Sequence, residues 1–199
     1  GSSIVNGGAG DDTLVSGLGA DTYYGGAGWD TVDYSNHPEG IYVNFDTVAN
    51  DGYDGEGDNI GFDVERIYGT AFDDRIYGGK RAAEIYGGDG NDTLQASNAG
   101  SYLYGEDGDD ALAGRGGNDV LDGGAGNERM DGGLGDDEFY GGDGVDTVSY
   151  AQRTADLSLY ISGVAESGED GEFDLIFPDI EVIRGGSGND LIVGSDNHE

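Results

Sequence analysis

The sequence lacks the cysteines that could form disulfides and has few basic residues that could bind a negatively charged partner. It contains no cysteine, which excludes disulfides and thiolate metal sites. Only eight lysine and arginine residues stand against 42 aspartate and glutamate residues, so the formal net charge is −34. This charge argues against nucleic acid and anionic membranes as partners. No apolar run is long enough to form a membrane-spanning helix, and no signal-peptide pattern is found.

Glycine is abundant instead, and much of it lies in a nine-residue unit that runs nine times from residue 69 to residue 149. The eighth position of every unit is apolar, and seven of the nine sixth positions carry a carboxyl group. The unit at Gly87 has the clearest form, G-G-x-G-x-D-x-U-x, where U is a large apolar residue. An unbroken register of this kind is typical of a solenoid built from stacked repeats.

The two halves of the unit predict different local structures. The x-U-x end alternates outward, inward and outward, as in a short strand with one core-facing side chain. The glycine-rich end has the residues that a tight turn requires. Two units then form one flattened coil, and unit n stacks on unit n+2. We therefore predict an all-β protein, a parallel β-roll (right-handed β-solenoid).

Stacking places the sixth-position carboxylates in two columns, with neighbours about 4.8 Å apart along the roll. Bare charges at that spacing repel each other by roughly 1 kcal/mol in bulk water and by about 3–4 kcal/mol at an effective dielectric constant of 20. A cation between turns reverses the sign of this interaction. Calcium is suitable because it takes 6–8 oxygen ligands from carboxylates and carbonyls. We therefore expect Ca2+, several ions per chain, as the cofactor, and metal binding should contribute folding energy.

These units resemble the RTX (repeats-in-toxin) family of secreted calcium-binding proteins, whose repeats form a parallel β-roll. The resemblance implies that successive turns on one edge bind calcium through the sixth-position carboxylate and backbone carbonyls of positions one to four. It also implies secretion from a bacterium through a type I apparatus. The implied ligands of the central block are Asp74, Gly87, Gly88, Gly90, Asp92, Gly105, Asp107, Gly108, Asp110, Gly114, Gly117, Asp119, Gly123, Gly126, Glu128, Gly133, Gly135, Asp137, Gly142, Gly144 and Asp146.

Two units of the central block depart from the pattern. The units at Gly78 and Ala96 have Ala83 and Ser101 at the sixth position, and the first of them carries Lys80 and Arg81 in its turn. We expect no calcium between these two turns.

The remaining segments fall around the central block. Residues 1–6 are a lead-in or tag, and residues 7–33 hold three repeats with the metal candidates Asp12, Asp21 and Asp30, of which the first and third should share an ion. Residues 34–68 and 150–184 break the register as two 35-residue β inserts, and residues 185–199 hold a repeat with Asp190 and a truncated one. The two inserts match each other at a constant offset, as in Tyr34 with Tyr150, which indicates an internal duplication.

Both inserts contain an Asp-x-Glu-x-Asp run, with Asp54, Glu56 and Asp58 in the first and Asp170, Glu172 and Asp174 in the second. Alternate carboxylates resemble part of an EF-hand loop, although the required glycine is missing. One hypothesis is an additional calcium site in each insert, and the alternative is a solvated acidic loop. The inserts should lie against the roll through Ile41, Val43, Phe45, Leu157, Leu159 and Ile161.

No catalytic constellation accompanies these repeats. His37 and His198 are the only histidines and are predicted to lie on the surface. Motifs of serine hydrolases, P-loop proteins and zinc proteases are absent, so we expect that the chain is not an enzyme, although its parent protein can be one. We predict a calcium-dependent folding module, a monomeric segment of a larger secreted or extracellular chain.

A row of tyrosines supports an alternative of a different class. Tyr86, Tyr104 and Tyr140 occupy the ninth position on one side of the roll, with Asp122 between the last two. Exposed aromatic rings can stack on sugars, although more often they support cross-strand packing. The alternative is therefore an accessory carbohydrate-binding or adhesive module of a polysaccharide-modifying enzyme, with polysaccharide as a possible partner.

Overall fold

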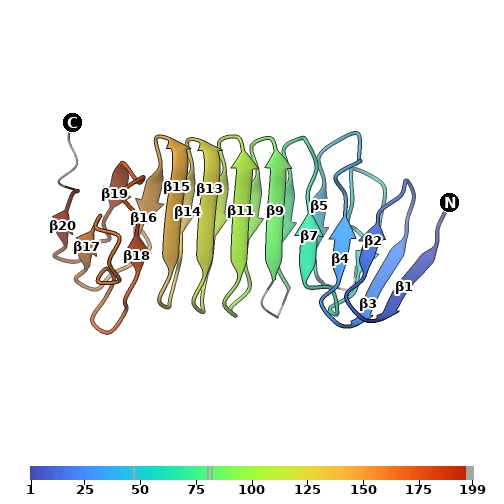
Figure 1. The fold of residues 1–199 in the computed structure, drawn as a ribbon, viewed down its shortest axis with the longest axis horizontal. Helices are drawn as coiled ribbons and strands as arrows, with labels where there is room; N and C mark the ends of the chain where they lie inside the picture. The colour runs from blue at the N-terminus through green and yellow to red at the C-terminus, as the bar shows by residue number, and fades with distance from the viewer. Residues whose placement is uncertain (47, 80, 82, 196–199) are drawn as a thin grey trace.

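The computed structural model describes residues 1–46, 48–79, 81 and 83–195, and within these residues all regular structure is β. Most strands belong to two long parallel sheets that form the two faces of a solenoid (Figure 1). The eight-stranded sheet contains β2 (Thr13–Val15), β4 (Thr31–Asp33), β7 (Arg66–Tyr68), β9 (Glu84–Asp89), β11 (Tyr102–Asp107), β13 (Val120–Gly126), β15 (Glu138–Gly144) and β18 (Leu175–Ile176). The seven-stranded sheet contains β5 (Tyr42–Asn44), β8 (Arg75–Tyr77), β10 (Thr93–Gln95), β12 (Ala111–Ala113), β14 (Arg129–Asp131), β16 (Thr147–Ser149) and β19 (Val182–Arg184).

Two smaller sheets extend the solenoid at its ends. Near the N-terminus, β1 (Ile4–Ala9), β3 (Thr22–Ala27) and β6 (Asn59–Ile60) form a three-stranded sheet. Near the C-terminus, β17 (Ser158–Tyr160) pairs with β20 (Leu191–Val193). Residues 4–6 of the predicted lead-in therefore belong to β1, which pairs with β3 at the same two-unit offset as the repeats. Lys80 and His198 lie outside the described residues.

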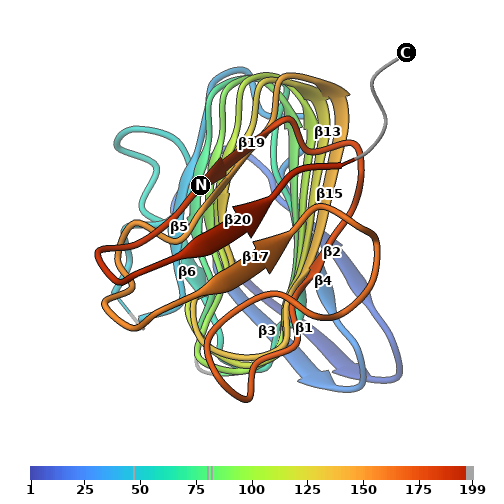
Figure 2. The same cartoon turned by 90° about the vertical axis from the view of Figure 1, so that its left-hand side faces the viewer.

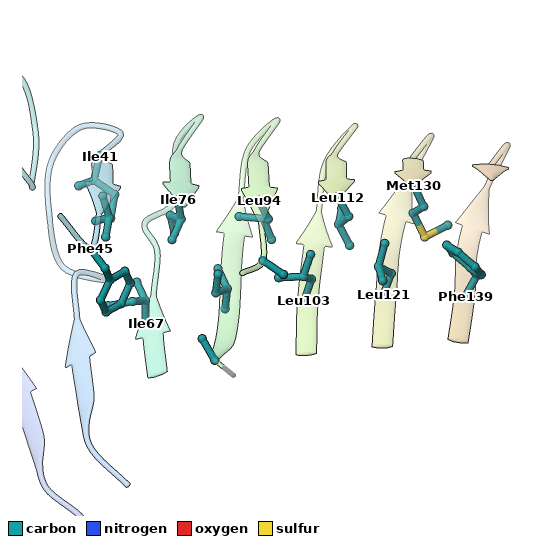
Figure 3. Packing of buried hydrophobic residues seen from close by; sticks show 14 of the residues in the cluster. Ile41, Phe45, Ile67, Ile76, Leu94, Leu103, Leu112, Leu121, Met130 and Phe139 are labelled. Carbon is teal, nitrogen blue, oxygen red and sulfur yellow. The ribbon is translucent and has the colours of Figure 1, made fainter. Parts of the chain in front are cut away.

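The predicted stacking of unit n on unit n+2 is confirmed. Thr93 pairs with Ala111 and Tyr102 with Val120, and in each pair the second residue lies two units further along the chain. The eighth-position side chains Ile76, Ile85, Leu94, Leu103, Leu112, Leu121, Met130, Phe139 and Val148 are all buried, between 0 and 2 % exposed. Those from the two sheets form two facing rows, with Leu94 and Leu112 in one row and Leu103 and Leu121 in the other (Figure 3). The core is therefore continuous along the roll but only one side chain thick per repeat.

Residues 34–68 and 150–184 contribute strands to the sheets, whereas the sequence predicts β inserts that lie against the roll. In the first segment, β6 is the edge strand of the three-stranded sheet, β7 joins β4 to β9, and β5 is the edge strand of the seven-stranded sheet. In the second, β18 ends the eight-stranded sheet, β19 extends the seven-stranded one, and β17 starts the two-stranded sheet, which lies obliquely across the end of the roll (Figure 2). We call these segments the first and second joint.

The predicted packing residues follow from this placement. Ile41, Val43, Phe45, Leu157 and Leu159 are buried in the core, and Ile161 is partly buried against it. Across a joint, paired residues lie further apart in the sequence than the two-unit offset of the repeats, and the three strand pairs have three different offsets. The pairs are Thr22 with Asn59, Thr31 with Arg66 and Tyr42 with Arg75. The second joint repeats all three offsets. The two joints are therefore structural copies, as their constant sequence offset indicates.

Candidate metal centres

The turns of the central roll stack along two edges. The upper edge in Figure 1 carries the turns at residues 69–74, 87–92, 105–110, 123–128 and 141–146. The lower edge carries those at 96–101, 114–119 and 132–137 and the described residues 78, 79, 81 and 83 of the turn before them. In most of these turns one oxygen of the sixth-position carboxylate accepts the backbone N–H of the sixth-position residue two units earlier. The N–H of Asp74 donates to Asp92 Oδ1 at 2.8 Å, and the N–H of Asp119 donates to Asp137 Oδ1 at 2.9 Å. Each such bond fixes a carboxylate between two coils.

The second oxygen of these carboxylates is buried and has no hydrogen-bond partner. This applies to Oδ2 of Asp12, Asp30, Asp92, Asp110, Asp119, Asp137 and Asp146, and to both side-chain oxygens of Glu128. A buried, ionised oxygen without a partner is costly, and proteins normally supply a counter-charge, a metal or a proton. The recurrence of the same unpartnered atom from turn to turn points to a cation.

In the acidic turns the first glycine of the unit leaves a space that oxygen atoms border and that a side chain would fill. A methyl group built on Gly87 would overlap the Asp92 carboxylate and lie 2.7 Å from the carbonyl oxygen of Gly105, on the next coil. The equivalent glycines Gly105, Gly114 and Gly123 are enclosed in the same way by their own carboxylate and by the following turn. A carboxylate oxygen and a carbonyl oxygen thus border one small space, and both are typical calcium ligands.

The other predicted turn glycines shape the backbone. Positive φ angles occur at Gly88, Gly90, Gly108, Gly117, Gly126, Gly133, Gly135, Gly142 and Gly144. This conformation suits glycine, because it has no Cβ to collide with the preceding turn. Asp107 lies at the end of β11 with an exposed side chain, and its carbonyl oxygen accepts the N–H of Gly90 at 2.8 Å. Within the described residues no three acidic or histidine side chains converge, so backbone carbonyls must complete any metal site.

Burial and mutual repulsion perturb the titration of these carboxyl groups. Burial, together with the charges of Asp74 and Asp110, raises the pKa of Asp92 to about 8. Burial likewise raises the pKa of Asp137 to about 8 and that of Asp119 to about 7. The pKa of Glu128 rises to about 8 through burial and the adjacent Asp146. Folding without a cation therefore requires several of these carboxyl groups to be protonated.

At two places on the edges, hydroxyl groups donate hydrogen bonds to the carboxylate or carbonyl oxygens of the turns. Asp74 accepts the Thr70 N–H at 2.6 Å and the Thr70 hydroxyl at 3.0 Å, so neither of its oxygens is free. On the lower edge the Ser97 hydroxyl donates to the Arg81 carbonyl, and the Ser101 hydroxyl to the Ala99 carbonyl, both at 2.8 Å. These bonds engage carbonyl groups in the two turns where the sequence predicts no calcium.

The carboxylates of the first and last repeats are also held by hydrogen bonds, but not all in the same way. The structure brings Asp12 and Asp30 together, because the N–H of Asp12 donates to Asp30 Oδ1 at 2.9 Å. Asp21 instead accepts the Ser3 N–H and lies 3.4 Å from the Tyr23 hydroxyl. Asp190 accepts the Leu157 N–H at 3.2 Å.

The alternate carboxylates of the joints do not gather around one point. Asp58 is fully buried and accepts the Asp21 N–H at 2.7 Å and the Tyr34 hydroxyl at 3.0 Å. Glu56 accepts the Gly19 N–H at 3.0 Å, and Asp54 is exposed. The second joint repeats this pattern.

In the second joint Asp174 accepts the Asp137 N–H at 2.9 Å and the Tyr150 hydroxyl at 2.6 Å. Glu172 is held by Arg153, and Asp170 is exposed. In both joints these side chains thus anchor different parts of the fold.

His37 is buried, which corrects its predicted surface position. It is 5 % exposed, and its Nδ1 lies 3.5 Å from Glu56 Oε2. At the equivalent position of the second joint, Arg153 donates to both carboxylate oxygens of Glu172 at 2.8 Å. Each joint thus places a basic side chain against a largely buried glutamate.

Sequence reasoning missed two carboxylates that occupy sixth-position places outside the repeats. Glu65 Oε2 accepts the Asp30 N–H at 3.0 Å, and Glu181 Oε2 accepts the Asp146 N–H at 2.9 Å. The available signal was that these two glutamates correspond to each other in the duplicated inserts, combined with their position directly before a strand.

The tyrosine row is longer and more tightly stacked than predicted. Tyr86 stacks on Tyr104 with ring centres 4.5 Å apart and planes inclined by 11°, and Tyr68 lies on the other side of Tyr86 at 4.7 Å. Tyr140 stacks on Phe177 at 4.3 Å. Within this row both faces of Tyr86 are covered by neighbouring rings.

A parallel solenoid whose acidic turns present unpartnered carboxylate oxygens next to carbonyl oxygens defines a calcium-binding repeat module. Comparison with protein-family models agrees: the model of the RTX calcium-binding nonapeptide repeat (4 copies) matches residues 1–34, 61–80, 86–121, 122–151 and 177–198. These matches cover more than half of the chain, and the protein belongs to this family. A search of curated proteins gives no match. The described residues contain no helix that could cross a membrane.

Proposed function

We propose that this chain is the calcium-dependent folding module of a secreted protein and that it is not itself catalytic. The observation that carries the proposal is the column of buried carboxylate oxygens that have no partner on either edge of the roll. Membership of a family of typically secreted bacterial calcium-binding proteins supports the extracellular setting.

The balance of forces explains why folding depends on the ion. The core receives one side chain from each repeat, so hydrophobic burial is small relative to the backbone entropy of ordering the chain. Burial also penalises the ionised carboxylates, which repel their neighbours one coil away. Bound calcium neutralises these charges and bridges adjacent coils. At a calcium concentration of 100 times the Kd, each site contributes about 2.7 kcal/mol.

The chain's own groups prepare these sites. The hydrogen bond to Oδ1 holds each carboxylate in place, and the turn glycines keep the space beside Oδ2 open. A chain of net charge −34 stays extended where calcium is scarce, which suits export in an unfolded state. Extracellular calcium modules typically bind with a Kd of about 10⁻⁴–10⁻³ M, so millimolar calcium folds the chain after export.

Circular dichroism during a calcium titration tests the proposal. At pH 8 we expect a disordered spectrum in chelator and a cooperative gain of β signal at millimolar calcium, with magnesium at the same ionic strength much less effective. Magnesium demands a more regular octahedral site and gives up its water reluctantly. An unchanged β spectrum and melting temperature in chelator would refute the proposal.

A carbohydrate-binding role is the second candidate, and one feature of the tyrosine row favours it. The row skips one ring at Asp122, whose strand lies between those of Tyr104 and Tyr140. This leaves ring surface on both sides of an acidic side chain, where a sugar could stack and donate hydrogen bonds.

Titration of neutral and acidic oligosaccharides against the calcium-loaded chain tests this second role. Tyr104→Ala should abolish the heat of binding, whereas Tyr77→Ala, on the opposite sheet, should leave it unchanged. Absence of binding by the parent chain would leave only the folding role.

A further inference from the structure

We propose that the first joint is a pH-sensitive switch that holds the turn at residues 16–21 firmly only while His37 is protonated, and that the second joint is its pH-insensitive copy. The inference goes beyond the proposed calcium-dependent folding and requires only that the calcium-loaded roll is folded. It assigns a role to a buried histidine that does not belong to any nonapeptide unit.

His37 lies in surroundings that suit a cation better than a neutral ring. The residue is 5 % exposed, and its Nδ1 lies 3.5 Å from Glu56 Oε2. Both ring nitrogens are buried, and neither has a hydrogen-bond partner among the described residues. Two aromatic rings lie against the imidazole, with ring centres at 5.0 Å for Tyr34 and 5.9 Å for Tyr53. A protonated imidazole is attracted by Glu56 and by these rings, whereas a neutral imidazole leaves the buried glutamate without a counter-charge.

Glu56 connects His37 to the turn at residues 16–21. The Glu56 side chain is 0 % exposed, and its Oε1 accepts the Gly19 N–H at 3.0 Å. This carboxylate therefore binds the turn through one oxygen and faces His37 with the other. The charge on His37 decides whether the carboxylate that holds the turn is compensated.

The second joint has an arginine at the place of this histidine, and arginine stays charged at every physiological pH. Arg153 donates to both oxygens of Glu172 at 2.8 Å and to Glu169 Oε1 at 3.1 Å. It also donates to the Gly133 carbonyl oxygen, in the turn at residues 132–137. Because this side chain remains protonated, its contacts with the turn do not change between pH 5 and pH 8.

Two further carboxyl groups act on Tyr34, the ring beside His37. The hydrogen bond from the Tyr34 hydroxyl to Asp58 recurs in the second joint, so it does not distinguish the two copies. Asp51 accepts a backbone N–H of the neighbouring strand, and in the second joint the uncharged Ser167 takes this place. Burial raises the pKa of Asp51 to about 7, so its ionisation at higher pH weakens the first joint in the same direction.

The direction of the pH effect follows from the contact between His37 and Glu56. Histidine is the side chain whose ordinary pKa places its change of charge between pH 5 and pH 8. The attraction to Glu56 exists only for the protonated form, so it stabilises the joint at low pH and is lost as the pH rises. Rising pH should therefore loosen the turn at residues 16–21 and leave the turn at residues 132–137 unchanged.

Hydrogen exchange measured by NMR on the full chain at saturating calcium tests the inference. The Asp21 N–H donates to Asp58 in the first joint and the Asp137 N–H donates to Asp174 in the second, so the two amides are a matched pair. After correction for intrinsic rates, a change from pH 5.5 to pH 8 should reduce the protection of Asp21 by about ten- to a hundredfold, the range for one hydrogen bond to a charged group. The protection of Asp137 should not change.

Three variants exchange or remove the basic side chain. His37→Arg should keep Asp21 protected at pH 8, and Arg153→His should make the protection of Asp137 depend on pH. His37→Gln is the neutral control: relative to the parent chain, it should reduce the protection of Asp21 at pH 5.5 and have no effect at pH 8. This last comparison does not depend on whether the larger arginine fits the first joint.

A parallel pH response of Asp21 and Asp137 in the parent chain would overturn the inference. An equal loss of protection in His37→Gln at both pH values would also overturn it, because such a loss indicates a purely structural role. Both outcomes leave calcium-dependent folding intact. A parent chain that fails to fold at saturating calcium would instead refute the proposed function.

Discussion

Two neighbouring pairs of turns on the lower edge share the same strand stacking but differ in the side chains at their sixth positions and in their hydrogen bonds. The turns at residues 114–119 and 132–137 present buried Oδ2 atoms of Asp119 and Asp137 without partners. The turns at residues 78–83 and 96–101 have no carboxylate at the sixth position. The hydroxyl groups of Ser97 and Ser101 donate hydrogen bonds to carbonyl oxygens in these turns. We call the first pair the acidic turns and the second pair the hydroxyl turns.

The difference shows that strand stacking and metal binding are separable. β9 and β11 pair in the same two-unit register as β13 and β15, and the Ser101 N–H still donates to Asp119 Oδ1 at 2.7 Å. A neutral hydrogen bond contributes about 0.5–1.5 kcal/mol whatever the calcium concentration. An acidic turn contributes more, but only when calcium is bound. The roll therefore combines turns whose stability is independent of calcium with turns whose stability depends on the bound ion.

The largest expected effect is a loss of stability of the metal-free roll as pH rises. Asp92 and Asp137 have pKa values of about 8 in the folded chain, against 3.8 as the ordinary value. Because these pKa values are raised, their contribution to stability is complete below about pH 4 and disappears as pH rises through about 8. Each group contributes on the order of 5 kcal/mol at most, at about 1.36 kcal/mol per pKa unit. Circular dichroism in chelator from pH 4 to pH 8 measures the effect as the pH at which the β signal is lost.

Hydrogen exchange provides the internal control for this pH effect. After correction for intrinsic rates, amides of the acidic turns should lose protection with rising pH earlier than those of the hydroxyl turns, which lack these groups. Calcium and protons compete for the same oxygens, so calcium affinity should rise over the same range. A metal-free roll whose stability increases from pH 4 to pH 8 would contradict the assignment.

A smaller effect is expected from Asp119→Asn, which makes an acidic turn resemble a hydroxyl turn. Asparagine keeps an acceptor for the Ser101 N–H but places an amide where the unpartnered oxygen lies. At saturating calcium we expect a loss of about 2–3 kcal/mol, the contribution of one site. In chelator at pH 5, where the metal-free roll is still folded, the loss should vanish, because the Asp119 carboxyl, with a pKa of about 7, is then neutral like the amide that replaces it. Equal losses under both conditions would show that this turn holds no ion.

The reciprocal change, Ser97→Ala, should weaken the hydroxyl turns by about 1–2 kcal/mol, because it leaves the carbonyl of Arg81 without its donor. The loss should be the same in chelator at pH 5, where the metal-free roll is folded, and at saturating calcium, as measured by urea unfolding. A calcium-dependent loss would mean that Ser97 contributes to a metal site.

The sequence was sufficient for every feature that follows the nine-residue period. The strand positions, the buried residues from Ile76 to Val148 and the stacking of unit n on unit n+2 all derive from one spacing. A period carries this information because each unit meets only its neighbours.

The joints could not be predicted in the same way. Strand pairing across them bears no relation to the nine-residue period, so the membership of β5, β6 and β7 in the sheets was missed. The Asp-x-Glu-x-Asp run suggested one shared cation, but Asp58 and Glu56 bind backbone groups of the distant turn at residues 16–21. The burial of His37 depends on that long-range packing and has no local signal.

The smallest expected effect concerns backbone strain, which both kinds of turn share. Glu106 and Arg115 occupy second positions of their units with φ angles of +76° and +71°, where most other units of the central block have glycine. A non-glycine residue in this region costs about 1 kcal/mol or slightly more, although glycine also raises the entropy of the unfolded chain. Glu106→Gly should therefore stabilise the calcium-loaded roll by about 0.5–1 kcal/mol, with an equal gain at low calcium.

The matched control is Gly88→Ala at the second position of the unit at Gly87. Its φ is +108°, and a Cβ there would overlap the Thr70 carbonyl oxygen, so this change should destabilise the roll by more than Glu106→Gly stabilises it. Urea unfolding of both variants measures the pair. If Glu106→Gly changed the number of bound calcium ions, its effect would belong to a metal site and not to the backbone. An unchanged ion count with a small gain in stability would show that backbone strain in the turns is independent of both calcium binding and the hydroxyl hydrogen bonds.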